Sequence, residues 1–230
     1  MMKPLGLGYQ KIDMCPNFCM LYYFEKAELT ECMICEHSRY KPRTGRGKTL
    51  VAFKKSRYFP ITHRLQKLLM SPWIVEHMTW HQSHDAVDGV MVHPSNGKAW
   101  KHFNSVHTHF SAESMNAHLG LCTDGFNPFG SFAASYSWWP IILSVYNLPP
   151  GMCMRPEFMF LSTVIPGPNS PGRNIDVILR PNFGSGLTIS ILYPLSIEYG
   201  NYLTNTHTFR SGRICIHLVW IKLSYLRVII

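Results

Sequence analysis

Residues 119–130 read LGLCTDGFNPFG, and this stretch decides how the middle of the chain folds. Its first half is a short apolar run that ends in the carboxylate of Asp124. A turn signal follows at once, because glycine, asparagine and proline occupy Gly125, Asn127, Pro128 and Gly130. The sequence therefore predicts a strand with Asp124 at its carboxyl end, where the backbone bends away.

Two more apolar runs follow the first, at Tyr136–Leu148 and Phe158–Ile165. Each run is closed by a cluster of proline and glycine, so each is predicted to be a strand. Asp176 then opens a predicted helix, where its carboxylate can cap the amino end. Three successive strands and a helix, with an aspartate on the first strand, are typical of the start of a ribonuclease-H-like nuclease core. We expect the three strands to pair as a meander.

The composition is that of a folded, basic protein. Of the 230 residues, 46% are hydrophobic and 13% aromatic, which argues against general disorder and allows one or two domains. The net charge of +9 favours an anionic partner, most commonly nucleic acid, although a merely basic protein is the alternative. The amino terminus lacks the apolar core of a secretory signal. Because Lys222 and Arg227 interrupt the apolar stretch Ile214–Ile230, we expect no membrane span.

Four of the seven cysteines form two close pairs, Cys15-x3-Cys19 and Cys32-x2-Cys35. An odd cysteine count without a signal peptide argues against a secreted disulfide framework. Two close pairs joined by a short loop suit tetrahedral zinc held by four thiolates, and the metal would supply folding energy to so small a segment. Four reduced cysteines without a metal are the alternative. Phe18 and Glu36 occupy turn positions at which such sites prefer glycine or small polar residues.

A basic segment follows the cysteines. No Asp or Glu occurs between His37 and Val75, which contains ten Lys and Arg residues. Such unbalanced charge, with aromatic residues interleaved, is typical of DNA contact, although a flexible linker or a nuclear-import signal fits it equally well. The cations predicted to bind DNA are Arg39, Lys41, Arg43, Arg46, Lys48, Lys54, Lys55 and Arg57. Beyond them, Pro60–Met70 has the periodicity of an amphipathic helix.

Twelve histidines raise the question of a second metal site. His77 and His81 are four residues apart and could share a helix face, but Met78 stands where a metalloprotease carries its glutamate. Further histidines are expected to be scattered among loops, each as a structural or surface residue: His93, His102, His107, His109 and His118. We therefore expect no protease and no histidine metal centre.

The chain resembles the transposases of CACTA-type (En/Spm-like) plant DNA transposons from about Leu5 to about Pro181. The resemblance rests on long phrases rather than on one short motif. These phrases are LGLGYQKID, CMLYY, SRYK, RLQKLLMS, DGVMVHP, AWKHF, LGLCTDGFNPFG, YNLPPGMCM and IPGPNSPGRNIDV. After Asn182 the resemblance ends abruptly, which indicates a truncated or frameshifted copy, with a genuinely divergent tail as the alternative.

The resemblance implies an α+β fold with a small four-cysteine zinc-binding module and the first three strands of an incomplete ribonuclease-H-like core. It implies DNA as partner, a nuclear location, and metal-dependent DNA cleavage and strand transfer in the intact family. Asp124 matches the first magnesium-binding aspartate, but the other acids lie beyond the point where the pattern stops. Asp176 comes too early to replace them, and Asp85 and Asp88 precede the first strand.

We therefore expect four parts: a zinc-binding module at 1–41, a basic, His-rich linking region at 42–118, a partial core at 119–181 and a poorly ordered tail at 182–230. This copy would retain DNA binding at most. With the crossover helix and later strands missing, one edge of the three-stranded sheet should be open. A non-catalytic zinc- and DNA-binding module, and a pseudogene product without a stable fold, are the alternatives. The oligomeric state does not follow from the sequence.

Overall fold

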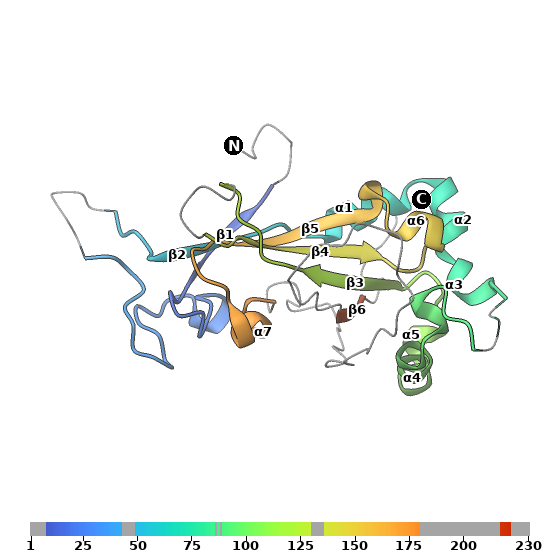
Figure 1. The fold of residues 1–230 in the computed structure, drawn as a ribbon, viewed down its shortest axis with the longest axis horizontal. Coiled ribbons are helices and arrows are strands. Elements are labelled where there is room, and N and C mark those ends of the chain that lie inside the picture. Colours follow the sequence, from blue (N-terminus) through green and yellow to red (C-terminus); the bar gives the residue numbers. More distant parts are fainter. Residues whose placement is uncertain are drawn as a thin grey trace. The chain divides into compact units, whose positions relative to one another are not determined.

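The computed structural model describes residues 8–42, 49–85, 87, 89–129, 136–179 and 217–221. All three predicted core strands are confirmed, as β3 (Ala117–Thr123), β4 (Trp139–Val145) and β5 (Met159–Ile165). Most residues of these strands are buried, and turn residues end them where the sequence predicts. Figure 1 shows the arrows of β3 and β4 running in opposite directions.

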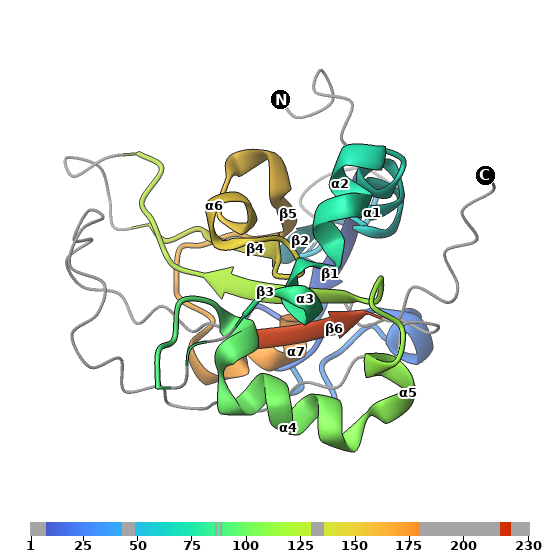
Figure 2. The same ribbon diagram turned by 90° about the vertical axis from the view of Figure 1, so that its right-hand side faces the viewer.

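The sheet has the strand order β1-β2-β5-β4-β3-β6, so the predicted meander is confirmed at its centre. The added strands are β1 (Gln10–Met14), β2 (Lys54–Tyr58) and β6 (His217–Ile221). The expectation of an open edge is wrong, because β2 pairs antiparallel with β5 and β6 pairs antiparallel with β3. Figure 2 shows β6 beside β3. Backbone N–H and C=O groups along the outer sides of β5 and β3 therefore pair with β2 and β6. Such groups would otherwise form an exposed edge that can pair with another chain.

Short helices accompany the sheet and make the fold a mixed α/β one. Helix α1 (Thr62–Leu69) confirms the predicted amphipathic helix, with Leu65 and Leu69 buried. The other α-helices are α2 (Pro72–Met78), α3 (Trp80–Ser83), α4 (Lys98–Val106), α5 (Thr108–Ser111), α6 (Pro150–Cys153) and α7 (Ile175–Leu179). The 3-10 turns are η2 (Phe24–Lys26), η3 (Pro94–Asn96), η4 (Pro156–Phe158) and η5 (Gly172–Asn174).

The chain divides into two compact units. The first comprises residues 1–61, 125–141 and 161–184, and the second comprises residues 62–124, 142–160 and 185–230. Strands β4 and β5 each contribute residues to both units. The four paired cysteines and the described part of the basic segment up to Ile61 belong to the first unit.

The core of the second unit contains aromatic rings and buried histidines. The rings of Trp100 and His118 stack with 4.0 Å between their centroids, and His81 lies 5.0 Å from His118. Burial lowers the pKa of His93 to about 4 and that of His118 to about 2. The expectation of a loop position is therefore wrong for His118, which lies within β3. His93 lies in a loop just before η3, and both are buried, structural histidines. A shared helix face for His77 and His81 is also wrong, because α2 ends at Met78.

One glycine of the opening stretch is required by packing. A Cβ on Gly120 would lie 2.1 Å from Cζ of Tyr146, so only glycine leaves room for this ring. Leu119 and Leu121, on either side of it, are fully buried. The LGL phrase thus places two leucines in the core of the second unit and seats an aromatic ring against Gly120 on the opposite face of the strand.

Of the tail at 182–230, the structure describes only β6, so the expected poor order lies outside the described residues. Helix α7 contains Asp176 near its start, in agreement with the predicted helix. Within the described part of the chain, no helix combines the length and apolarity needed to cross a membrane.

Candidate metal centre

Each cysteine pair sits in a tight turn between antiparallel backbone bridges. The first turn begins where β1 ends, and the bridge Met14↔Leu21 closes it. Within it, the N–H of Cys15 donates to the carbonyl of Met20 at 3.0 Å. The second turn is closed by the bridge Glu31↔Ser38. The backbone itself therefore presents both pairs, as the spacing predicts.

The two turns use the left-handed backbone region, where side chains are disfavoured. Phe18 has φ 60° and Glu36 has φ 57°. These are the two positions at which the sequence departs from glycine, and each costs about 1–2 kcal/mol relative to ordinary backbone. The N–H of Glu36 donates to the carbonyl of Cys32 at 2.8 Å, which holds the second turn in this conformation.

The structure brings all four predicted cysteines together. The sulfurs of Cys15, Cys19, Cys32 and Cys35 all lie within 4.8 Å of one another, and the Sγ atoms of Cys15 and Cys35 are 3.5 Å apart. Thiolates bound at about 2.3 Å to a tetrahedral ion would be about 3.8 Å apart. The cluster can therefore hold a metal ion such as zinc after small side-chain adjustments.

The thiols differ in their surroundings. The backbone N–H of His37, with help from the side-chain amide of Asn17, lowers the pKa of Cys35 to about 6. Burial raises the pKa of Cys15 to about 12. Cys35 is exposed, while Cys15 and Cys32 are buried against Met20 and Tyr22. This apolar backing is small, so a metal would add most of the cohesion of the module.

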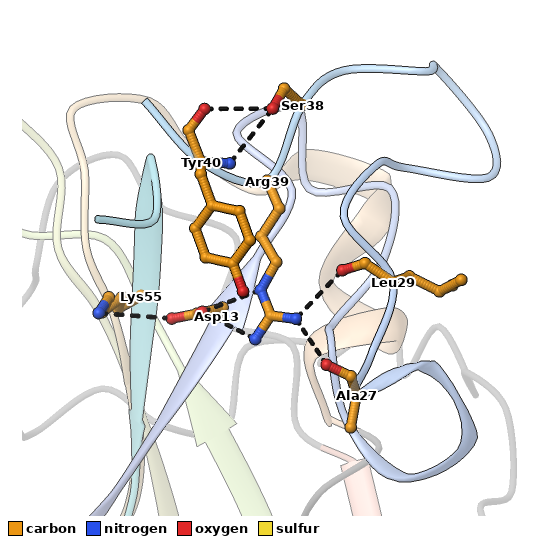
Figure 3. Close-up of polar contacts among 7 residues, drawn as sticks. All are labelled: Asp13, Ala27, Leu29, Ser38, Arg39, Tyr40 and Lys55. Carbon is orange, nitrogen blue, oxygen red and sulfur yellow. Dashed lines mark hydrogen bonds and ion pairs between the residues drawn. The ribbon is translucent and has the colours of Figure 1, made fainter. Parts of the chain in front are cut away.

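Arg39 holds the module together from the side (Figure 3). Its Nε donates to Oδ2 of Asp13 at 3.0 Å, and its Nη2 lies 2.9 Å from the same oxygen. Its Nη1 donates to the carbonyls of Ala27 and Leu29, and the guanidinium covers the ring of Tyr22 at 4.7 Å. One arginine thus ties β1 to the loop between the cysteine pairs.

Two further contacts surround the cysteine turns. Lys54, at the start of β2, places Nζ 3.6 Å from the centre of the Phe18 ring, and burial lowers the pKa of this lysine to about 8. The side-chain amide of Asn174 donates to the carbonyl of Asn17 at 3.3 Å. The cysteine module therefore contacts both β2 and η5 within the first unit.

The predicted DNA-binding cations fall into three groups. Arg43, Arg46 and Lys48 lie outside the described residues. Arg39 and Lys54 are committed to the cysteine module, since Arg39 exposes only 14% of its side chain. Lys41 and Lys55 are exposed and Arg57 is partly exposed, and Lys54–Tyr58 form strand β2 rather than a flexible linker. Their contact with DNA stays a prediction.

Asp124 follows β3 directly, at the carboxyl end of the strand as predicted, and is half-buried. The next residue, Gly125, is tightly packed, because a Cβ there would lie 2.6 Å from Oγ of Ser137. Burial and, secondarily, the Asp124 carboxylate raise the pKa of Cys122. Among the described residues, the four cysteines form the one group of three or more His, Cys, Asp or Glu side chains within metal-binding reach. Asp124 is not part of such a group.

Sequence reasoning missed the parts played by Asp13, Lys11 and Asn17. Asp13 lies two residues before Cys15, and this proximity was the available signal for its role beside the module. Lys11 and Arg57 are direct cross-strand partners in β1 and β2, which follows from the register alone. A count of charges along the chain does not reveal such pairings.

Comparison with known proteins gives one family. Residues 88–192, just under half of the chain, match the model described as Transposase family tnp2. The matched segment contains β3, β4, β5 and Asp124, but not the four paired cysteines. Neither the curated proteins nor the solved structures include a significant match. This part of the chain is thus similar to a transposase family.

Proposed function

We propose that the chain is a transposase-derived fragment that binds DNA through a zinc-stabilised amino-terminal module. The observation that carries this proposal is the joint occurrence of a tnp2-like segment and a four-thiol cluster next to a basic strand. The net charge of +9 supports an anionic partner. DNA is the partner that a transposase family implies.

The finer assignment is to CACTA-type (En/Spm-like) transposases of plants, with a nuclear location. The long shared phrases support it, because they extend from the cysteine module to η5. The three-stranded meander with Asp124 after its first strand supports a ribonuclease-H-like ancestry. The strand pattern thus favours the fold, and the phrase resemblance favours the family.

In this proposal Cys15, Cys19, Cys32 and Cys35 hold the zinc ion. Four thiolates complete its tetrahedral coordination and leave no open position, so the ion is structural rather than catalytic. Its role is to fix the two cysteine turns, including their left-handed residues Phe18 and Glu36. The module then presents β1 and β2 in one defined arrangement.

The chain alone is proposed to be unable to cleave DNA. Two-metal chemistry needs several oxygen ligands that converge on both ions, and magnesium binds a single carboxylate weakly. The test is a cleavage assay on transposon-end DNA with magnesium or manganese. Turnover that disappears in Asp124→Asn would overturn this part of the proposal.

The central experiment measures zinc content and DNA affinity in the same preparations. We expect one zinc per chain and nanomolar to micromolar binding to a duplex that weakens steeply with salt. Cys32→Ser should lose both, while the control Cys122→Ser should keep both. Wild-type protein without zinc would refute the metal centre, and zinc-loaded protein without salt-dependent affinity would refute DNA binding.

A zinc- and DNA-binding module that has lost all enzymatic function is the second candidate, favoured by the absence of a metal-binding group around Asp124 among the described residues. A pseudogene product without a stable fold is the third. A cooperative thermal transition in far-UV circular dichroism would exclude the unfolded product. Cleavage activity restored by supplying the missing carboxyl-terminal part in trans would separate a split enzyme from the module.

A further inference from the structure

One face of β1 and β2 carries a cationic row, in which Lys11 and Lys55 are exposed and Arg57 is partly exposed. Four side chains share this face, because residues two apart on a strand point the same way. The register sets Lys11 opposite Arg57 and Asp13 opposite Lys55. The intervening Ile12 and Ser56 point to the other face and are buried. We call Lys11, Asp13, Lys55 and Arg57 the β1/β2 cationic face.

The single acid of this face is already engaged. Oδ2 of Asp13 accepts from Arg39 at 2.9–3.0 Å, and Oδ1 lies 3.6 Å from Nζ of Lys55. Among the described residues, neither Lys11 nor Arg57 takes part in an ion pair. On the other side of β2, the residue opposite Arg57 is the apolar Val164. The face therefore keeps an uncompensated positive charge.

Two cations directly opposite each other weaken an antiparallel pair, since their Cβ atoms lie about 5 Å apart. Protection of an edge strand would explain Lys11, because lysine on an edge discourages pairing with another chain. It does not explain Arg57, which lies on β2 between β1 and β5. A bound phosphate would remove the repulsion, and a guanidinium can bind its oxygens with two parallel hydrogen bonds.

We infer that the β1/β2 cationic face is the docking surface for the phosphate backbone of duplex DNA, with Lys11 and Arg57 as its principal contacts. This inference rests on the proposed DNA binding and specifies where it takes place. Lys55 extends the row along β2, about 7 Å from Arg57. The ion pair of Asp13 with Arg39 anchors this face to the cysteine module, so the metal centre fixes the position of the row. The contacts reach phosphates rather than base edges, so binding is independent of sequence.

The test uses the full zinc-loaded chain and a fluorescein-labelled 30-base-pair duplex of arbitrary sequence. Anisotropy titrations from 50 to 300 mM NaCl give the slope of log K against log salt. The double variant Lys11→Gln/Arg57→Gln should flatten this slope by about 2 and weaken binding at least tenfold at low salt. The matched control Lys26→Gln/Lys101→Gln removes the same charge elsewhere and should change the slope by much less.

The outcomes separate the two proposals. Wild-type protein that does not bind the duplex refutes the proposed function. Binding that persists unchanged in Lys11→Gln/Arg57→Gln, or that falls equally in the control, overturns the docking surface alone. Thermal melts should show the double variant to be at least as stable as wild type, because a repulsive pair is lost. Tighter, variant-sensitive binding to phosphatidylserine vesicles than to DNA would also overturn the inference.

Discussion

At the scale of single residues, Arg39 is the side chain whose chemistry is least replaceable. Its planar guanidinium contacts one carboxylate, two carbonyls and the rings of Tyr22 and Tyr40 at the same time. A lysine retains the charge but cannot reach these partners together. We expect Arg39→Lys to destabilise the zinc-loaded protein by roughly 2–3 kcal/mol, because buried acceptors lose their donors.

Chemical denaturation with a zinc-saturated sample measures this loss. Lys41→Arg is the matched control, since Lys41 is exposed and two residues away. A midpoint unchanged in Arg39→Lys would show that the contacts of Arg39 contribute no net stability.

The buried histidines make stability depend on pH. The folded state keeps His93 neutral, with a pKa of about 4 against an ordinary value near 6.5. Its contribution is therefore complete above about pH 7 and is lost as the pH falls from 6.5 towards 4. For His93 alone the loss between pH 7 and pH 4 is roughly 3 kcal/mol, and His118 continues the trend at lower pH.

Denaturant midpoints at pH 7.5, 6 and 5 test this dependence. His93→Asn keeps a side-chain acceptor for the N–H of Ser95 but does not titrate, so its profile should be flatter. The exposed His63 is the control, and His63→Asn should follow the wild-type profile. Parallel profiles for all three proteins would contradict the assignment.

At the scale of elements, the LGL phrase of β3 is the sharpest constraint on packing. Gly120→Ala places a methyl group where the ring of Tyr146 lies. We expect a loss of about 1–3 kcal/mol, since an overfilled core must shift side chains or backbone. Gly151→Ala is the control, because nothing lies within 4 Å of a Cβ at that position. Equal thermal midpoints for both variants would count against the close packing of β3.

The elements also show what sequence alone could predict. Strands β3, β4 and β5 were predictable because continuous apolar runs end at proline and glycine. Strands β1 and β2 were not, since QKIDM and KKSRY are mostly polar and β2 takes its second partner from far along the chain. The cysteine cluster followed from spacing, which is a local property. The ion pair of Arg39 with Asp13 could not be predicted from the sequence, because nothing around Arg39 indicates which carboxylate it will contact.

At the scale of the whole molecule, the two units have different sources of stability. Within the first unit, the cysteine module relies on a small apolar cluster and, in our proposal, a metal ion, whereas the second unit buries Trp100, Phe103 and both leucines of β3. Removal of zinc should therefore increase amide hydrogen exchange in residues 13–41 and leave β3 protected. Exchange mass spectrometry of loaded and chelator-stripped protein measures this. An equal increase in β3 would mean that the units unfold together.

The pairing of β2 with β5 affects the order in which the sheet can form during synthesis. The two strands are separated by about a hundred residues, so β2 leaves the ribosome long before its second partner exists. At roughly 5–20 residues per second, the delay is on the order of 5–20 s. The pairing of β1 with β2 and the bridges that close the cysteine turns lie within residues 10–58 and can form first. During synthesis the thiol cluster would then hold β2 in place beside β1, so that β2 does not pair with a wrong strand before β5 has been made.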